Sequence, residues 1–104
     1  MPANAFEVVA DPSRRALLDI LIAGALPVGE LARRAQLSQP NTSRHLRILR
    51  EAGLVQSRAV GRQRLYGLRG EGFASLARWL TPYVVLWQGG VKALEEHLDR
   101  EDRR

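Results

Sequence analysis

The stretch from residue 28 to residue 69 constrains the fold more than any other part of the chain. Apolar residues recur at helical spacing in residues 28–35 and again in residues 39–52, with a short polar turn between the two runs. A small hairpin pattern with arginine at its tip follows. Two short helices joined by a tight turn and followed by a hairpin form a winged helix-turn-helix. The predicted fold class is therefore mainly α with a small β-hairpin.

Positive charge is concentrated in the same region. Residues 33–69 contain nine arginines and one acid, Glu51, which gives this segment a net charge of +8. The whole chain carries only +5, so the remainder of the chain sums to −3. A charge excess confined to one contiguous segment favours a surface that faces a polyanion. This distribution indicates a DNA-binding protein.

Capping residues predict where two of the helices begin. Asp11-Pro12 is a strong helix start, with Asp11 as the N-cap and proline where a missing N–H costs nothing. Ser38 is expected to cap the arginine-rich helix, and Pro40 lies in its first turn. His45 falls on the inner side of that helix, where we expect a packed and hydrogen-bonded core histidine.

The hairpin is predicted from residues 55–58 and 63–68, which show the pattern of two strands. The turn between them is expected to be Ala59-Val60-Gly61-Arg62, with Gly61 supplying the positive φ that such turns need. The predicted wing thus spans residues 55–68.

A long apolar stripe marks the C-terminal part of the chain. From residue 73 to about residue 100, apolar residues recur at steps of three and four, which predicts helix. Thr81-Pro82 leaves two alternatives open: a new helix capped by Thr81, or one long helix kinked at Leu80. The stripe is too long for so small a core to cover, so residues 73–100 and a short helix within residues 1–10 are expected to form a dimer. The predicted interface residues are Phe6, Val84, Trp87, Val91, Leu94 and Leu98.

The second helix of a helix-turn-helix enters the major groove with its N-terminal end nearest the bases. Its amide side chains suit adenine, and the guanidinium of Arg44 suits guanine. Arg47 and Arg50 lie further along the helix and are expected to reach phosphates, whereas the hairpin arginines suit the flanking backbone or the minor groove. The DNA-contacting residues expected on this basis are Gln39, Asn41, Ser43, Arg44, Arg47, Arg50, Arg58, Arg62 and Arg64.

Composition excludes several classes of protein. The chain has no cysteine, so it has no disulfide, no thiolate metal site and no cysteine nucleophile. The chain has two histidines and no pair of carboxylates within an apolar run, so we identify no set of catalytic residues. We therefore expect that the protein is not an enzyme and uses no cofactor. We find neither a leader peptide nor an apolar run near the ~20 residues of a membrane span, and expect a soluble cytoplasmic protein. A length of 104 residues predicts one domain over residues 1–104, with the helix-turn-helix at 28–53.

Several motifs, in order and at matching spacing, resemble the ArsR/SmtB family of bacterial repressors. They are Asp11-Pro12-Ser13-Arg14-Arg15, Glu30-Leu31-Ala32, Leu37-Ser38-Gln39-Pro40-Asn41-Thr42-Ser43-Arg44-His45-Leu46, Leu49-Arg50-Glu51-Ala52-Gly53-Leu54-Val55 and Gly61-Arg62. The resemblance covers residues 5 to about 70. It implies a homodimer that binds double-stranded operator DNA and represses its own operon. On the recognition helix it points to Gln39, Pro40, Ser43 and Arg44.

The metal sites of that family do not carry over. Pro27 and Gly29 occupy the positions of its two cysteines, and His97 stands with Glu96 and Asp99 in a cluster too sparse for zinc. The run Trp79-Leu80-Thr81-Pro82-Tyr83 with Trp87 resembles a cysteine-free branch, so no metal is expected and no small-molecule effector can be named.

Some alternatives stay open. A winged helix can also serve as a protein-interaction or RNA-binding module, because the fold alone does not fix the partner. A metal-responsive repressor with a non-standard site is a further alternative. Trp79, Tyr83 and Trp87 suit either a small-molecule pocket or, as we favour, a core or dimer seam. Arg14 and Arg15 suit phosphate contacts or, as we favour, a structural role.

Overall fold

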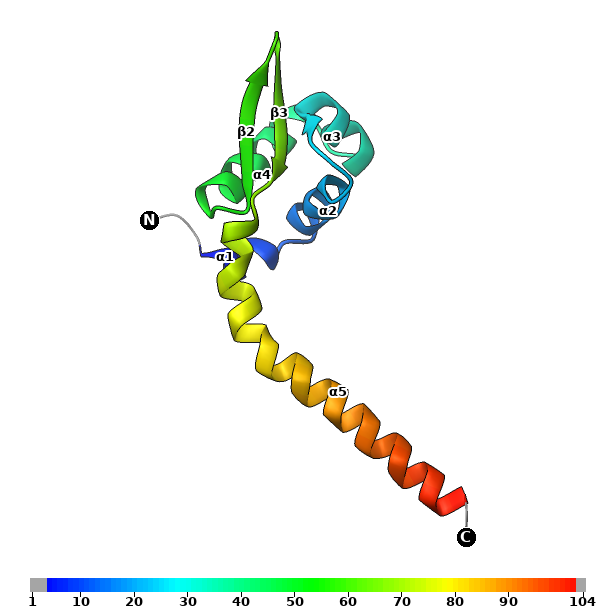
Figure 1. Cartoon of the computed structure of the whole chain (residues 1–104). Coiled ribbons are helices and arrows are strands. Elements are labelled where there is room, and N and C mark those ends of the chain that lie inside the picture. The colour runs from blue at the N-terminus through cyan, green and yellow to red at the C-terminus, as the bar shows by residue number, and fades with distance from the viewer. Residues whose placement is uncertain (1–3, 103–104) are drawn as a thin grey trace. The chain divides into compact units, whose positions relative to one another are not determined.

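Helices make up most of the chain, and a small sheet accompanies them (Figure 1). The structure is a computed structural model that describes residues 4–102, without the side chains of Val91 and Asp102. The elements are α1 (Ala5–Val9), α2 (Pro12–Leu21), β1 (Leu26–Pro27), α3 (Val28–Ala35), α4 (Gln39–Glu51), β2 (Val55–Val60), β3 (Gln63–Leu68), the 3-10 helix η1 (Gly70–Phe73) and α5 (Ala74–Asp102). The predicted helix-turn-helix and wing are confirmed. Of the predicted helix in residues 1–10, residues 1–3 lie outside the described part.

The two predicted helix caps are confirmed. The Asp11 carboxylate accepts a hydrogen bond of 3.0 Å from the backbone N–H of Arg14, at the start of α2. The Ser38 hydroxyl accepts one of 3.2 Å from the N–H of Asn41, at the start of α4. Gln36 adopts a left-handed conformation with φ of 58° and ends α3. Together Gln36 and Ser38 fix the tight turn between α3 and α4.

The core of the N-terminal unit lies where α2, α3 and α4 pack together, with α4 also against β2. Its largest fully buried side chains are Leu17, Leu31, Leu46, Leu49, Leu54, Val8, Val55 and Thr42. The Thr42 hydroxyl donates to the backbone oxygen of Ser38 (2.9 Å), so this polar group is satisfied. His45 is buried as predicted, but its Nδ1 has no hydrogen-bond partner among the described residues, so the expected hydrogen bonding is not found at that atom.

Arg14 joins the first two helices. Its Nε donates a hydrogen bond of 2.8 Å to the backbone oxygen of Val8, close to the end of α1. This contact supports the structural role that we favoured for Arg14.

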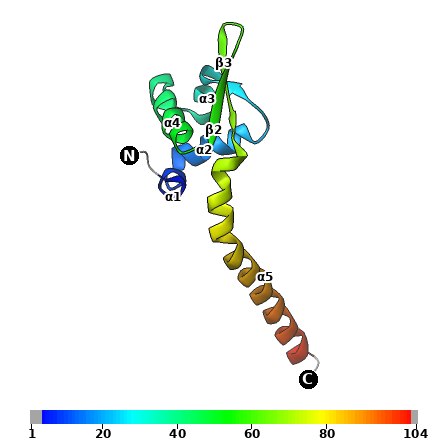
Figure 2. The ribbon, with the colours of Figure 1, turned by 60° about the vertical axis from the view of Figure 1, so that its left-hand side comes forward.

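The sheet has three strands in the order β1-β3-β2, all antiparallel. The predicted four-residue turn is wrong, because pairing continues to Val60 opposite Gln63 and leaves Gly61-Arg62 as a two-residue turn. Gly61 has φ of 61° at the first turn position, a geometry that closes a hairpin in two residues. The short strand β1 was not predicted. In both views the hairpin of β2 and β3 extends past the helices of its own unit (Figures 1 and 2).

The chain forms two compact units, one ending at Ala74 and the other, made of α5, beginning at Ser75. Phe73 belongs to η1 rather than to the long helix, which begins one residue later than predicted. Pro82 lies inside α5, and the Thr81 hydroxyl donates to the backbone oxygen of Ala77. A single helix therefore runs through Pro82, and Thr81 does not cap a second one.

Apolar side chains of α5 are exposed along its whole length. The exposed large ones are Trp79, Leu80, Tyr83, Val84, Val85, Leu86, Trp87, Leu94 and Leu98. The rings of Trp79 and Tyr83 lie against each other, with centroids 5.0 Å apart. Phe6 on α1 is also exposed. Val91 lies in α5, but its side chain is outside the described part. None of the described helices has the length and apolar character needed to cross a membrane.

Candidate nucleic-acid interface

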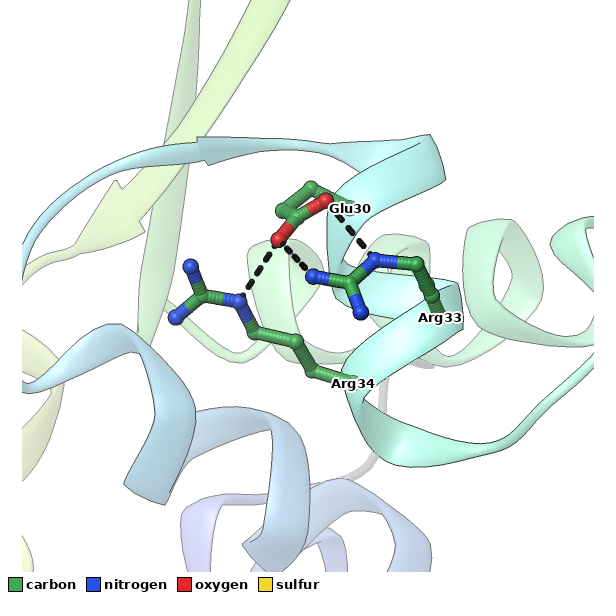
Figure 3. Close-up of polar contacts among 3 residues, drawn as sticks. All are labelled: Glu30, Arg33 and Arg34. Carbon is green, nitrogen blue, oxygen red and sulfur yellow. Dashed lines mark hydrogen bonds and ion pairs between the residues drawn. The ribbon is translucent and has the colours of Figure 1, made fainter.

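Three of the nine arginines in residues 33–69 have carboxylate partners. Glu30 on α3 accepts from Arg33 Nη2 and, at 2.8 Å, from Arg34 Nε, because residues three and four apart share a helix face (Figure 3). The hydrogen bonds from Arg33 and Arg34 lower the pKa of Glu30 to about 2, so the carboxylate stays ionised. Arg69 pairs with Glu71 at 2.9 Å. These three arginines thus share two carboxylates, which offset most but not all of their positive charge.

The other six arginines of that segment are exposed and have no carboxylate partner within residues 4–102. They are Arg44, Arg47, Arg50, Arg58, Arg62 and Arg64. All six belong to α4 or to the hairpin, and they are the arginines that the sequence assigned to DNA. Within the described residues, ion pairing thus separates the nine arginines into three that lie beside a carboxylate and six that have none.

The N-terminal half of α4 presents the predicted base-reading side chains. Gln39, Pro40, Ser43 and Arg44 are exposed, and Asn41 is half-buried. Arg44 Nη2 donates a hydrogen bond of 2.6 Å to Asn41 Oδ1, one turn earlier on the same helix. The structure therefore joins two of the predicted residues into one hydrogen-bonded pair on the exposed side of α4.

An open hollow of about 450 Å³ lies between α4 and the sheet. Its lining residues are Ser43, Arg44, Arg47, Arg50 and Tyr66. Four of them were assigned to DNA from the sequence, and the fifth, Tyr66, lies on β3. A hollow lined mainly by guanidinium groups suits an anion.

The wing arginines lie in three different positions. Ser57 pairs with Tyr66 and Arg58 pairs with Leu65 in the antiparallel register. Because side chains alternate along a strand, Arg64 shares the face of Ser57 and Tyr66, and Arg58 lies on the opposite face. Arg62 belongs to the turn. The hydroxyl of Ser57 accepts from Arg64 Nη1 at 3.0 Å and from Arg50 Nη1 at 3.5 Å. No pattern in the sequence had indicated Ser57.

The described residues contain no group of three or more His, Cys, Asp or Glu side chains that could hold a metal ion. His97 Nε2 is paired with Glu101 Oε1 at 2.9 Å on α5, rather than with Glu96 or Asp99. Pro27 precedes α3 as its N-cap residue, and Gly29 lies in the first turn of that helix.

Comparisons with known proteins agree with this fold. The family model described as bacterial regulatory protein, arsR family, matches residues 11–57. The chain is 37% identical over 100 residues to the HTH-type transcriptional regulator Rv2034 of Mycobacterium tuberculosis, covering 96% of this chain and 91% of that protein. It is 30% identical to the transcriptional repressor SdpR of Bacillus subtilis, over 78% of this chain and 90% of that one.

Solved structures of similar proteins have the same fold. A crystal structure of a possible transcriptional regulator for arsenical resistance superposes with a TM-score of 0.68 at 42% identity, over 74% of this chain and 80% of the other. The homodimeric winged helix-turn-helix DNA-binding domain of Mb0332 from Mycobacterium bovis superposes with a TM-score of 0.63 at 27% identity. The match covers 75% of this chain and 72% of the other. The chain therefore belongs to the ArsR family of bacterial regulatory proteins.

Proposed function

We propose that this protein is a transcriptional repressor that binds an inverted-repeat operator as a homodimer. The observation that carries the proposal is the set of six arginines on α4 and the hairpin that have no carboxylate partner among residues 4–102. Recognition helix and wing are the two elements with which winged helix-turn-helix proteins contact DNA. A regulator of this kind acts on DNA in the cytoplasm and needs no catalytic residues.

Within this proposal the side chains divide into two roles. Gln39, Asn41, Ser43 and Arg44 read base edges in the major groove, with Pro40 beside them in the first turn of α4. The arginines further along α4 and on the wing bind phosphates, which set register and affinity. The phosphate-binding residues in this assignment are Arg47, Arg50, Arg58, Arg62 and Arg64.

The proposed dimer uses α1 and the apolar stripe of α5, so that residues 1–104 work as a single functional domain. Phe6, Val84, Trp87, Leu94 and Leu98 are exposed in the isolated chain, and an exposed apolar band of this size normally marks an interface. Val91 is included from its position in the sequence. The relatives named as repressors and the homodimeric relative support this assignment.

A gel-shift experiment on the DNA upstream of the protein's own gene tests the proposal. We expect a discrete complex that survives an excess of competitor RNA and of unrelated duplex. The Arg44→Ala variant should bind that fragment with reduced preference over unrelated duplex. Displacement by RNA, or the lack of any shift with DNA, would instead favour an RNA-binding or protein-interaction module.

A further inference from the structure

Ser57 lies in the middle of β2 and accepts hydrogen bonds from two arginines on different elements. Arg64 on β3 donates at 3.0 Å, and Arg50 on α4 approaches to 3.5 Å, the outer limit for such a bond. One hydroxyl therefore links the recognition helix to both strands of the hairpin.

Electrostatics make this arrangement unusual for a purely structural contact. Two guanidinium groups converge on one neutral oxygen, and neither Arg50 nor Arg64 has a carboxylate partner within the described residues. Like charges held close together repel each other, and an anion bound between them offsets this repulsion. A structural role alone would be better served by an acidic residue at position 57.

The hydrogen-bonding capacity of the three groups also matches an anion. A serine hydroxyl has two lone pairs and one proton, so accepting from both arginines leaves its O–H to donate. The three side chains then offer only donors, as the oxygens of a phosphate require. Arg50 also lines the hollow of about 450 Å³ beside α4, together with Tyr66, which faces Ser57 across the strands.

We propose that Ser57 is a positioning residue that directs Arg50 and Arg64 at one phosphate of the DNA backbone. The inference rests on the proposed DNA-binding function. It adds that the recognition helix α4 and the wing formed by β2 and β3 contact the same phosphate. A guanidinium already held in place loses less side-chain freedom when it binds, so Ser57 strengthens binding through the arginines.

Arg58 provides a matched control for this proposal. It is the residue next to Ser57 on the same strand, and it carries the same charge as Arg64. It lies on the opposite face, opposite Leu65, and makes none of the hydrogen bonds described for Ser57. Its contribution to DNA affinity should therefore be independent of the Ser57 hydroxyl.

A double-mutant cycle on the full-length protein tests the coupling. The probe is a random-sequence DNA duplex, because a phosphate contact does not depend on sequence. Ser57→Val removes the hydroxyl and Ser57→Thr keeps it, while both residues favour a strand and have nearly the same shape. We expect Arg64→Ala to weaken binding about tenfold in the wild-type and Ser57→Thr backgrounds, and about twofold in Ser57→Val. Arg58→Ala should weaken binding by the same factor in all three.

Two results would overturn the inference, and they differ in meaning. If wild-type protein binds the duplex and Arg64→Ala weakens binding by the same factor in every background, Ser57 does not position Arg64. The proposed function then still stands. If wild-type protein binds no duplex at all, both fail together. Should Ser57→Val fold poorly by circular dichroism, Ser57→Ala takes its place in the same cycle.

Discussion

At the scale of single residues, the partner of each arginine decides what that arginine can do. Arg33 and Arg34 share the one carboxylate of Glu30 on α3, whereas Arg44 is held by the uncharged amide of Asn41. An amide orients a guanidinium without cancelling its charge. Arg44 thus keeps both the charge and the orientation that recognition of a guanine edge requires.

The variants Arg44→Ala and Arg62→Ala should impair DNA binding in different ways. Losing Arg44 should weaken the free energy of binding to the operator by ~1–3 kcal/mol and relax discrimination at one base pair, because this side chain is assigned to base reading. Losing Arg62 at the hairpin turn should weaken all sequences alike and lower the salt slope by about one unit. Titrations of operator and scrambled duplex at several salt concentrations measure both effects. If both variants keep full sequence discrimination, the assignment of Arg44 is wrong.

His45 should make the protein less stable in mild acid. Burial lowers the pKa of His45, although the nearby charge of Asp11 acts in the opposite direction. A folded pKa below the unfolded one means that the unfolded chain takes up the proton first, so stability falls as pH drops through about 6.5. Urea unfolding at about pH 7.5 and about pH 5.5 measures this loss.

The control for the acid effect is a variant without the imidazole. His45→Gln should remove most of the difference between the two pH values. The pKa of Asp11 is lowered, chiefly by the hydrogen bond from the Arg14 backbone, so its own contribution is lost only in stronger acid. An unchanged pH dependence in His45→Gln would contradict the explanation.

At the scale of elements, local signals in the sequence were enough for most of the fold. The caps at Asp11 and Ser38 depend on bonds to residues three positions away, so both helix starts could be predicted. The strand β1 could not, because Leu26 and Pro27 become a strand only by pairing with distant Tyr66 and Leu65. A proline is tolerated there because β1 is an edge strand.

Much of the candidate site could also be predicted from the sequence, but its internal contacts could not. The pattern of exposed positions on α4 identified the arginines of the recognition helix. Ser57 went unnoticed because its role depends on register: Arg64 and Arg50 reach it only after the hairpin pairs and docks on α4. The ion pairs of Glu30 differ in this respect, because Arg33 and Arg34 follow it at the spacing of three and four residues that a sequence shows, and this signal was missed.

The junction between α4 and η1 should be intolerant of one small change. A Cβ at Gly72 would overlap the backbone carbonyl of Gly53 and lie 2.9 Å from the N atom of Leu54, and backbone atoms cannot move aside as a side chain can. Gly72→Ala should lower the free energy of unfolding by about 1–3 kcal/mol. Gly70→Ala is the matched control, because a Cβ there meets nothing within 4 Å. Equal unfolding midpoints for the two variants would contradict this packing.

At the scale of the whole molecule, the exposed apolar stripe of α5 should determine the oligomeric state. Leu94→Glu places a charge in the proposed seam and should shift the protein toward monomer, with weaker binding to an inverted repeat. Glu96→Gln, two residues further along the helix and thus on another face, should remain dimeric. Sedimentation measures both. A stable dimer in Leu94→Glu would show that the seam lies elsewhere.

The central claim is that two copies of α4 read two half-sites related by two-fold symmetry. One short helix reads only a few base pairs, so useful specificity needs two copies. A hydroxyl-radical footprint on the upstream DNA tests this claim most directly. The account predicts two symmetric protected segments centred about one helical turn apart, on the order of 10–11 bp, with flanking protection from the wings. Protection of a single unrepeated half-site would contradict it.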